Sequence, residues 1–167
     1  MNKKQKGFSL IELLIVVAII LIIAAIAIPN LIRSKMAANE ASAVATLRTI
    51  NTSQVVYSST YSTAAVFGTL AQLGSGGSAG ANCTPAALQA TPPTSADACL
   101  IDSAIENANT VSKSGYDLNV AVAAGGYTAN NNPHTPNSSG VRYFFTDQSL
   151  VIRQNATAAA GPGDPPI

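Results

Sequence analysis

The sequence is poor in charged and aromatic residues, and these shortages argue against several classes of protein. Charged residues make up only 10% of the 167-residue chain, and the formal net charge at pH 7 is +1. Nucleic-acid binding usually needs a basic surface that neutralises phosphates, so this balance argues against nucleic-acid partners. Tryptophan is absent and aromatic residues make up 5% of the chain, so platforms for stacking bases are not suggested either.

Residues that could build a catalytic or cofactor site are also scarce. The single histidine, His134, lies among asparagines and prolines, where a solvated loop residue is favoured over a metal ligand or a catalytic base. The sequence shows no Ser/His/Asp or Cys/His arrangement and no phosphate-binding loop. Asp97, Asp102 and Asp147 could offer oxygens to calcium, but their spacing favours turn and capping roles. The sequence therefore predicts a protein that is not an enzyme and holds no cofactor or metal.

A long apolar run near the N-terminus is the dominant feature of the sequence. Residues 13–28 are all apolar, and three lysines lie within residues 1–7. A helix over Phe8–Ile28 rises about 1.5 Å per residue and spans roughly the 30 Å of bilayer hydrocarbon. The preceding lysines place the N-terminus in the cytoplasm by the positive-inside rule, although Arg33 and Lys35 oppose this weakly. The remainder of the chain is then expected on the other side of the membrane.

Glu12 lies at the start of this run and distinguishes three interpretations. A secretory signal peptide could end at the small residues of Ala25–Ala27, but the run is long for that role and begins with a carboxylate. A plain membrane anchor leaves Glu12 unexplained, because a charge in hydrocarbon costs several kcal/mol. Cleavage after Gly7 would create a free amine on Phe8, one helical turn before Glu12. The amine and the carboxylate could then neutralise each other within one chain or between neighbouring chains.

Residues 6–20, which read KGFSLIELLIVVAII, resemble the leader and N-methylation motif of type IV pilins and type II secretion pseudopilins. The resemblance implies that a prepilin peptidase cuts after Gly7 and methylates the amine of Phe8. It also implies that Glu12 is the assembly carboxylate and that Pro29 kinks the helix. The implied partners are further copies of the chain in a homopolymer, other pilins, the inner membrane, the prepilin peptidase and an assembly platform.

The same resemblance implies an α+β fold, with a long N-terminal helix packed on a small antiparallel sheet. Beyond Pro29 the pattern continues as a helix, because proline loosens or kinks a helix at this position without ending it. One buried face is predicted from residues spaced by three and four: Val44, Leu47, Ile50, Gln54, Tyr57 and Tyr61. Off this face lie Asn39, Glu40, Arg48, Thr49, Asn51 and Thr52.

The composition changes after residue 61 and predicts a small head with few regular elements. Residues 74–80 are a glycine- and serine-rich loop, and Thr94-Ser95 could cap a short helix over 97–105. Residues 116–123 alternate as a half-buried strand, and Gly125-Gly126 turns the chain toward a short strand at 127–128. Residues 130–137 are expected to be a polar loop.

A final hairpin is predicted from strands at 141–146 and 150–154, joined around Asp147-Gln148-Ser149. This hairpin resembles the last one of a pilin-like subgroup in which many members carry glycine where Leu150 stands. The absence of that glycine leaves the geometry of the turn open.

The two cysteines, Cys83 and Cys99, follow the apolar run, so both reach an oxidising space if the N-terminus stays in the cytoplasm. A disulfide is then favoured over two unrelated buried thiols. Many type IVa pilins enclose a C-terminal loop with a disulfide, whereas these cysteines precede the predicted strands.

The predicted domain organisation has five parts: a cleaved leader at 1–7, a transmembrane and filament-core helix at 8–30, an amphipathic helix at 31–61, a head at 62–155, and an extended or disordered tail at 156–167. The primary hypothesis is a type IV pilus subunit, which waits in the inner membrane with its head in the periplasm and then joins an extracellular filament. A type II secretion pseudopilin is the alternative. A membrane-tethered enzyme or binding module is disfavoured by the missing catalytic residues.

Overall fold

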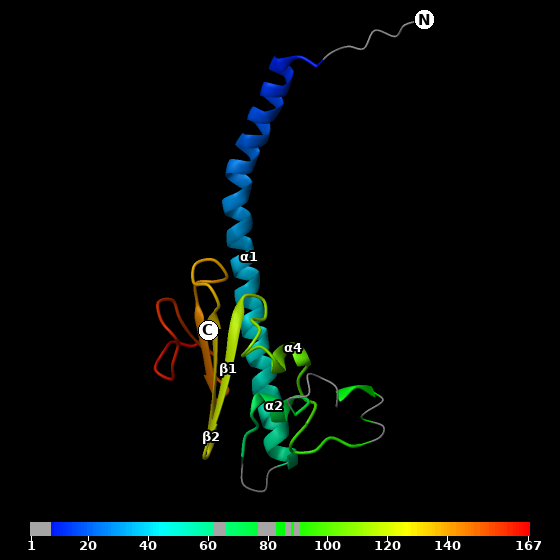
Figure 1. Ribbon diagram of the computed structural model, residues 1–167. Coiled ribbons are helices and arrows are strands. Elements are labelled where there is room, and N and C mark those ends of the chain that lie inside the picture. Colours follow the sequence, from blue (N-terminus) through cyan, green and yellow to red (C-terminus); the bar gives the residue numbers. More distant parts are fainter. Residues whose placement is uncertain (1–7, 62–65, 77–82, 86–87, 89–90) are drawn as a thin grey trace, which may run out of the picture. The chain divides into compact units, whose positions relative to one another are not determined.

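The long N-terminal helix and the small antiparallel sheet expected from the sequence are both present in the computed structural model, which describes residues 8–61, 66–76, 83–85, 88 and 91–167 (Figure 1). The helices are α1 (Leu10–Tyr61), α2 (Leu70–Leu73) and α4 (Ser103–Glu106). The strands are β1 (Tyr116–Ala123), β2 (Gly126–Pro133), β3 (Tyr143–Asp147) and β4 (Arg153–Asn155). This is the predicted pilin-like α+β fold. The leader at 1–7 and most of the glycine-rich loop at 74–80 lie outside the described residues.

The chain divides into two compact units, Met1–Lys35 and Met36–Ile167, and α1 contributes to both. In the first unit Pro29 lies inside the helix, as the sequence predicts. Among the described residues, α1 is the one helix long and apolar enough to cross a membrane. Its most apolar window has a mean hydropathy of 3.3 and no buried residue. The second unit contains the hydrophobic core and is described below by itself.

The sheet has the order β1-β2-β3-β4, with every neighbouring pair antiparallel. The alternation of residues 116–123 correctly predicted β1, in which Tyr116 and Leu118 are buried. The prediction of a polar loop from residue 130 was wrong, because β2 continues to Pro133. Side-chain hydrogen bonds of two asparagines hold this part of the strand. Asn130 donates to the carbonyl of Ala160, and the buried Asn131 donates to the carbonyl of Ala43 in α1.

The core lies between the C-terminal part of α1 and one face of the sheet. Its fully buried large side chains include Leu47 and Ile50 from α1 and Tyr116, Leu118, Tyr127 and Phe144 from the sheet. The predicted stripe is therefore largely present, but its polar content was underestimated. Glu40 and Asn51, which the sequence placed off the buried face, are both buried.

The short helix after the cysteines begins later than predicted. It comprises only Ser103–Glu106, and its N-cap is Asp102, whose carboxylate accepts a hydrogen bond from the backbone N–H of Ile105 at 2.7 Å. Thr94, the predicted cap, instead forms a local turn in which its N–H and hydroxyl both donate to the carboxylate of Asp97. Aspartate is among the strongest N-cap residues, which explains the later start.

The C-terminal residues pair with β4, whereas the sequence suggested an extended or disordered tail. Gln154 donates its backbone N–H to the carbonyl of Pro165 at 3.0 Å, and Ile167 donates to the carbonyl of Ile152 at 3.1 Å. Asp164 organises the intervening loop by accepting hydrogen bonds from the amide of Asn155 and the N–H of Gly161. The tail therefore covers the outer edge of β4.

The turn between β3 and β4 holds its last residue in a conformation that glycine adopts most readily. Leu150 has φ of +64°, in the left-handed region that side chains with a Cβ disfavour. The turn is held by Asp147, whose side chain accepts from the N–H of Ser149 and whose carbonyl accepts from the N–H of Leu150. Leu150 is exposed, so its side chain contributes little burial in return for the strain.

We predict that Leu150→Gly raises the free energy of unfolding by about 1 kcal/mol. Relief of the left-handed strain outweighs the larger unfolded-state entropy that glycine brings. Thermal unfolding of the full chain in detergent, followed by near-ultraviolet circular dichroism, measures the change. Val151→Gly is the matched control, since Val151 is the neighbouring exposed residue and lacks a positive φ. A lower melting temperature for Leu150→Gly than for the parent would contradict this reading of the turn.

Candidate assembly site

The predicted assembly residues lie at the beginning of α1. The carbonyl of Ser9 accepts hydrogen bonds from the N–H groups of Glu12 and Leu13 at 3.1 and 3.2 Å, which places Glu12 in the first helical turn. A carboxylate in the first turn interacts favourably with the positive end of the helix dipole. Phe8 lies just before the helix and is 74% exposed. Gly7, on the other side of the predicted cleavage site, lies outside the described residues.

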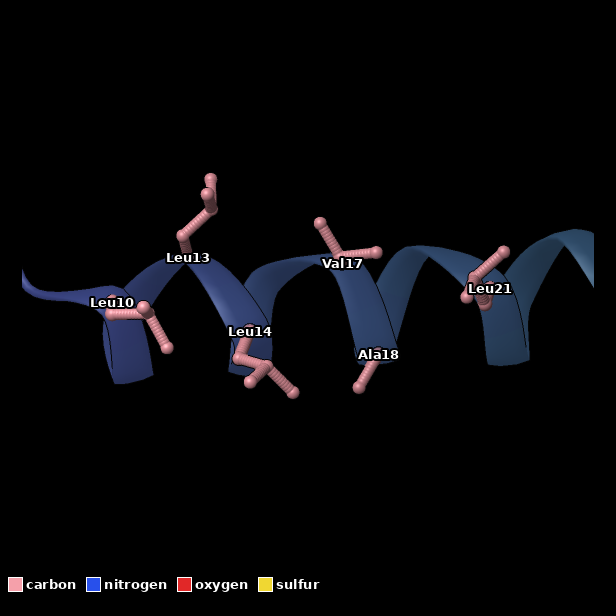
Figure 2. Close-up of a pocket in the computed structure, with 6 residues that line it drawn as sticks. All are labelled: Leu10, Leu13, Leu14, Val17, Ala18 and Leu21. Atoms are coloured by element: carbon pink, nitrogen blue, oxygen red, sulfur yellow. The ribbon is translucent and has the colours of Figure 1, made fainter.

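A shallow groove runs along the same part of α1 (Figure 2). Its lining is aliphatic throughout: Leu10, Leu13, Leu14, Val17, Ala18 and Leu21. In this view Leu13 and Val17 point to one side of the helix, whereas Leu14 and the small side chain of Ala18 point to the other. Because these residues recur at spacings of three and four, they form one helix face that could accept side chains of a second helix in a ridges-into-grooves arrangement.

Exposed apolar side chains extend well beyond this groove. Large aliphatic residues from Leu10 to Ile32 are between 46% and 78% exposed. Isolated exposed apolar residues are normal on a protein surface, but a continuous apolar segment marks a membrane or protein contact. Glu12 is the one acidic residue in this segment, so the carboxylate and the apolar face together form the candidate site.

The cysteines form the other predicted pair. Cys83 and Cys99 are joined by a disulfide with a Cα–Cα distance of 5.4 Å. Cys99 is also tied to the short helix α2, since its backbone N–H donates to the carbonyl of Gly74 at 2.9 Å. Leu100 continues this pairing by donating to the carbonyl of Leu73. The disulfide thus attaches the segment after α1 to the edge of the core.

An ion pair between the buried Glu40 of α1 and the half-exposed Arg142 lies just before β3, and the sequence did not predict it. The carboxylate of Glu40 accepts hydrogen bonds from the backbone N–H groups of Val141 and Arg142 at 2.9 and 3.2 Å, and from Nε of Arg142 at 2.7 Å. Burial alone raises the pKa of Glu40, but these donors outweigh it and hold that pKa below its usual value.

Tyr116 completes this cluster from β1. Its hydroxyl donates to the carbonyl of Arg142 at 2.8 Å, and burial together with the nearby Glu40 carboxylate raises the pKa of Tyr116 well above its usual range. The phenol therefore stays protonated and keeps donating. Gly140 makes the approach of the ring possible, because a Cβ there would lie 2.1 Å from the hydroxyl oxygen.

Two further polar residues on α1 hold the head at other points. Asn51 accepts from the hydroxyls of Tyr127 and Thr146 and donates to the carbonyl of Leu150 at 3.1 Å. Burial, with a smaller effect from Asp147, raises the pKa of Tyr127 to about 12, so this donor also stays protonated. Gln54 accepts from the N–H of Gly68 and donates to its carbonyl.

The sequence contained a positional signal for the burial of Glu40 and Asn51. The buried residues of α1 run through Glu40, Ala43, Leu47, Ile50, Asn51, Gln54 and Tyr57, at spacings of one, three and four. Both polar residues lie on the buried helical face by position. Glu40 lies four residues before Val44 and Asn51 four residues after Leu47, so the spacing of the predicted stripe extends to both.

We predict that Glu40→Gln lowers the free energy of unfolding by about 2 kcal/mol at neutral pH, because the buried side chain loses its charged hydrogen bonds to the backbone N–H groups of Val141 and Arg142. The parent should also lose stability as the pH falls. A carboxyl whose pKa is depressed by folding contributes stability above its unfolded pKa, near 4.5, and loses it as the pH falls through the folded pKa.

Melting temperatures of both proteins between pH 7 and pH 3 measure this difference. The Glu40→Gln variant should show a flatter decline than the parent. Asp117→Asn is the control, because Asp117 forms an exposed pair with His134 that contributes little to stability. Identical pH profiles for the parent and Glu40→Gln would refute the role of the ionised carboxylate.

Comparison with known proteins supports the interpretation of the N-terminal segment. Residues 2–28 match the family model of the prokaryotic N-terminal methylation motif. The chain is 49% identical to the type IV major pilin protein PilA of Myxococcus xanthus over 53 residues, which cover 32% of this chain and 24% of that protein. It is 58% identical to the type IV wide pilus major component PilA4 of Thermus thermophilus over 38 residues, or 23% of this chain and 29% of that protein.

These matches cover less than a third of each relative, and no solved structure matches the chain. The N-terminal segment therefore has sequence relatives, whereas the fold of the head is described from its structure alone. The chain carries the prokaryotic N-terminal methylation motif, and over part of its length it is similar to type IV major pilins.

Proposed function

We propose that this chain is a structural subunit of a type IV pilus. It is held in the inner membrane by the N-terminal part of α1, with its N-terminus in the cytoplasm and its head in the periplasm. It is cleaved after Gly7, methylated on the amine of Phe8, and polymerised through α1 into a surface filament. The observation that carries the proposal is Glu12, a lone carboxylate in the first turn of an exposed apolar helix that bears the methylation motif.

The chemistry of Glu12 explains why assembly needs cleavage. Removal of the leader exposes a positive amine on Phe8, one helical turn from the carboxylate. In an apolar surrounding, an unpaired carboxylate is costly and an amine of a neighbouring subunit is the nearest compensating charge. Pairing the two charges fixes the axial position of one helix against the next, so assembly and register become one event.

The apolar face supplies the remaining attraction. The aliphatic groove that includes Ala18 offers a surface for a second helix, and close packing drives helix association where water is absent. The relatives named above are both major pilus components, which favours a pilus over a secretion pseudopilus.

We predict that Glu12→Ala greatly reduces surface filaments while membrane insertion and processing continue, because only the pairing with the Phe8 amine is removed. Electron microscopy of sheared surface fractions measures filament yield, and immunoblots of membrane fractions measure insertion and cleavage. Glu12→Asp, which keeps the charge on a shorter side chain, is the matched control and should retain part of the yield. A parental filament yield from Glu12→Ala would rule out the assembly role.

We predict that Gly7→Leu blocks the cut and leaves a longer precursor in the membrane, because a Cβ and a bulky side chain hinder the approach of the peptidase to the backbone. Mass spectrometry of the purified subunit identifies its first residue. The parent should begin at Phe8 and carry one methyl group on its amine. If the variant shows the same mature mass as the parent, the site has been assigned to the wrong bond.

A further inference from the structure

The first part of α1 carries charges only at the two ends of a long uncharged stretch. Between Glu12 and Arg33 the helix has no charged side chain. Residues 13–32 cover about 30 Å at about 1.5 Å per residue, which is the thickness of the bilayer hydrocarbon. The uncharged stretch is therefore long enough to fill the membrane without either terminal charge entering it.

The structure shows that the apolar surface does not end at Pro29. Leu31 is 70% exposed and Ile32 is 47% exposed, so no described part of the chain covers them. Ser34 donates its hydroxyl to the carbonyl of Asn30 at 3.0 Å, which satisfies this polar group within the helix. Backbone and hydroxyl groups satisfied in this way are compatible with the edge of a membrane.

The basic pair Arg33 and Lys35 follows directly. Both side chains are exposed, and neither takes part in the ion pairs found within the described chain. Lys35 is also the last residue of the first compact unit. Long basic side chains at the end of a membrane helix extend to the interface, where they interact with anionic lipid phosphates.

We propose that Arg33 and Lys35 bind the phosphates of anionic phospholipids in the leaflet nearest the head and thereby set the depth of α1 in the membrane. Residues 13–32 then fill the hydrocarbon, and Glu12 lies at the headgroup boundary of the opposite leaflet. This inference rests on the proposed function only in placing α1 in the inner membrane.

This depth differs from a span over Phe8–Ile28 by about 7 Å along the helix. The span over Phe8–Ile28 places Glu12 about one turn inside the hydrocarbon and leaves Leu31 and Ile32 in water. The depth proposed here removes both costs. It also means that Glu12 is hydrated while the subunit waits in the membrane, and that the carboxylate loses water only when α1 enters a filament.

Cysteine labelling of the full-length chain in vesicles tests the depth directly. The vesicles contain phosphatidylcholine and phosphatidylglycerol, and the native disulfide is kept oxidised. A membrane-impermeant maleimide reacts with a thiolate in water but not with a thiol in lipid. We expect Leu31→Cys to label at least about tenfold more slowly than Ala37→Cys, which lies beyond the basic pair, because residue 31 is in hydrocarbon. Equal labelling of the two positions would overturn the proposal.

The role of the basic pair is tested by adding R33Q and K35Q to the Leu31→Cys chain. Loss of the lipid contacts should allow the helix to shift, and labelling at position 31 should rise severalfold. R48Q, which removes an exposed cation of α1 in the second unit, is the matched control and should leave labelling unchanged. Protection at position 31 that persists in the R33Q/K35Q chain would show that the two cations do not set the depth.

These outcomes are separable from the proposed function. Filament yield from the Glu12 variants does not depend on where the helix lies in the bilayer before assembly, so the depth can be wrong while the pilus subunit stands. Failure of the chain to associate with membranes at all would instead count against the proposed function.

Discussion

Buried polar side chains on α1 determine where the sheet and the loops attach along that helix. Glu40 holds the beginning of β3, Asn51 holds the turn at Leu150, and Gln54 holds the backbone of Gly68. Apolar burial supplies most of the stabilisation but has no direction, whereas each of these contacts has one satisfactory geometry. If α1 slid by one turn against the sheet, all three groups would lose their partners inside the fold, and each unsatisfied group would cost about 1–3 kcal/mol.

The polar residues of α1 occur in the core because they satisfy hydrogen-bonding groups of the backbone there. Strand ends and turns present backbone N–H and C=O groups that no neighbouring strand can bond. A side chain from α1 is the nearest alternative partner, and a carboxylate such as Glu40 can accept from two successive N–H groups as well as from a guanidinium. The scarcity of charged residues in this chain therefore does not mean that the few present lie on the surface.

The sequence was informative where one residue pattern corresponds to one structure. The uncharged run and the alternation of residues 116–123 each identify their element directly, and α1 and β1 followed from them. The buried Glu40 and Asn51 were not predictable in the same way, because their partners come from residues about a hundred positions away in the chain. The length of β2 was missed for a related reason. Asparagine is rare in strands, and only its contacts with Ala43 and Ala160 make it suitable here.

In the proposed pilus subunit, the C-terminal tail limits the ways in which chains can associate. An open strand edge is a template for pairing with another chain, and the hazard grows with local concentration. Here the outer edge of β4 is occupied by Pro165 and Ile167 through backbone hydrogen bonds. On the other side, Ala108 and Lys113 bond the first residues of β1. With the outer edge of the sheet covered at β4 and the start of β1 occupied, the exposed apolar face of α1 is the continuous apolar surface that remains among the described residues. Association through the helix therefore competes against fewer alternatives, which favours one ordered mode of assembly over irregular sheet-to-sheet aggregation.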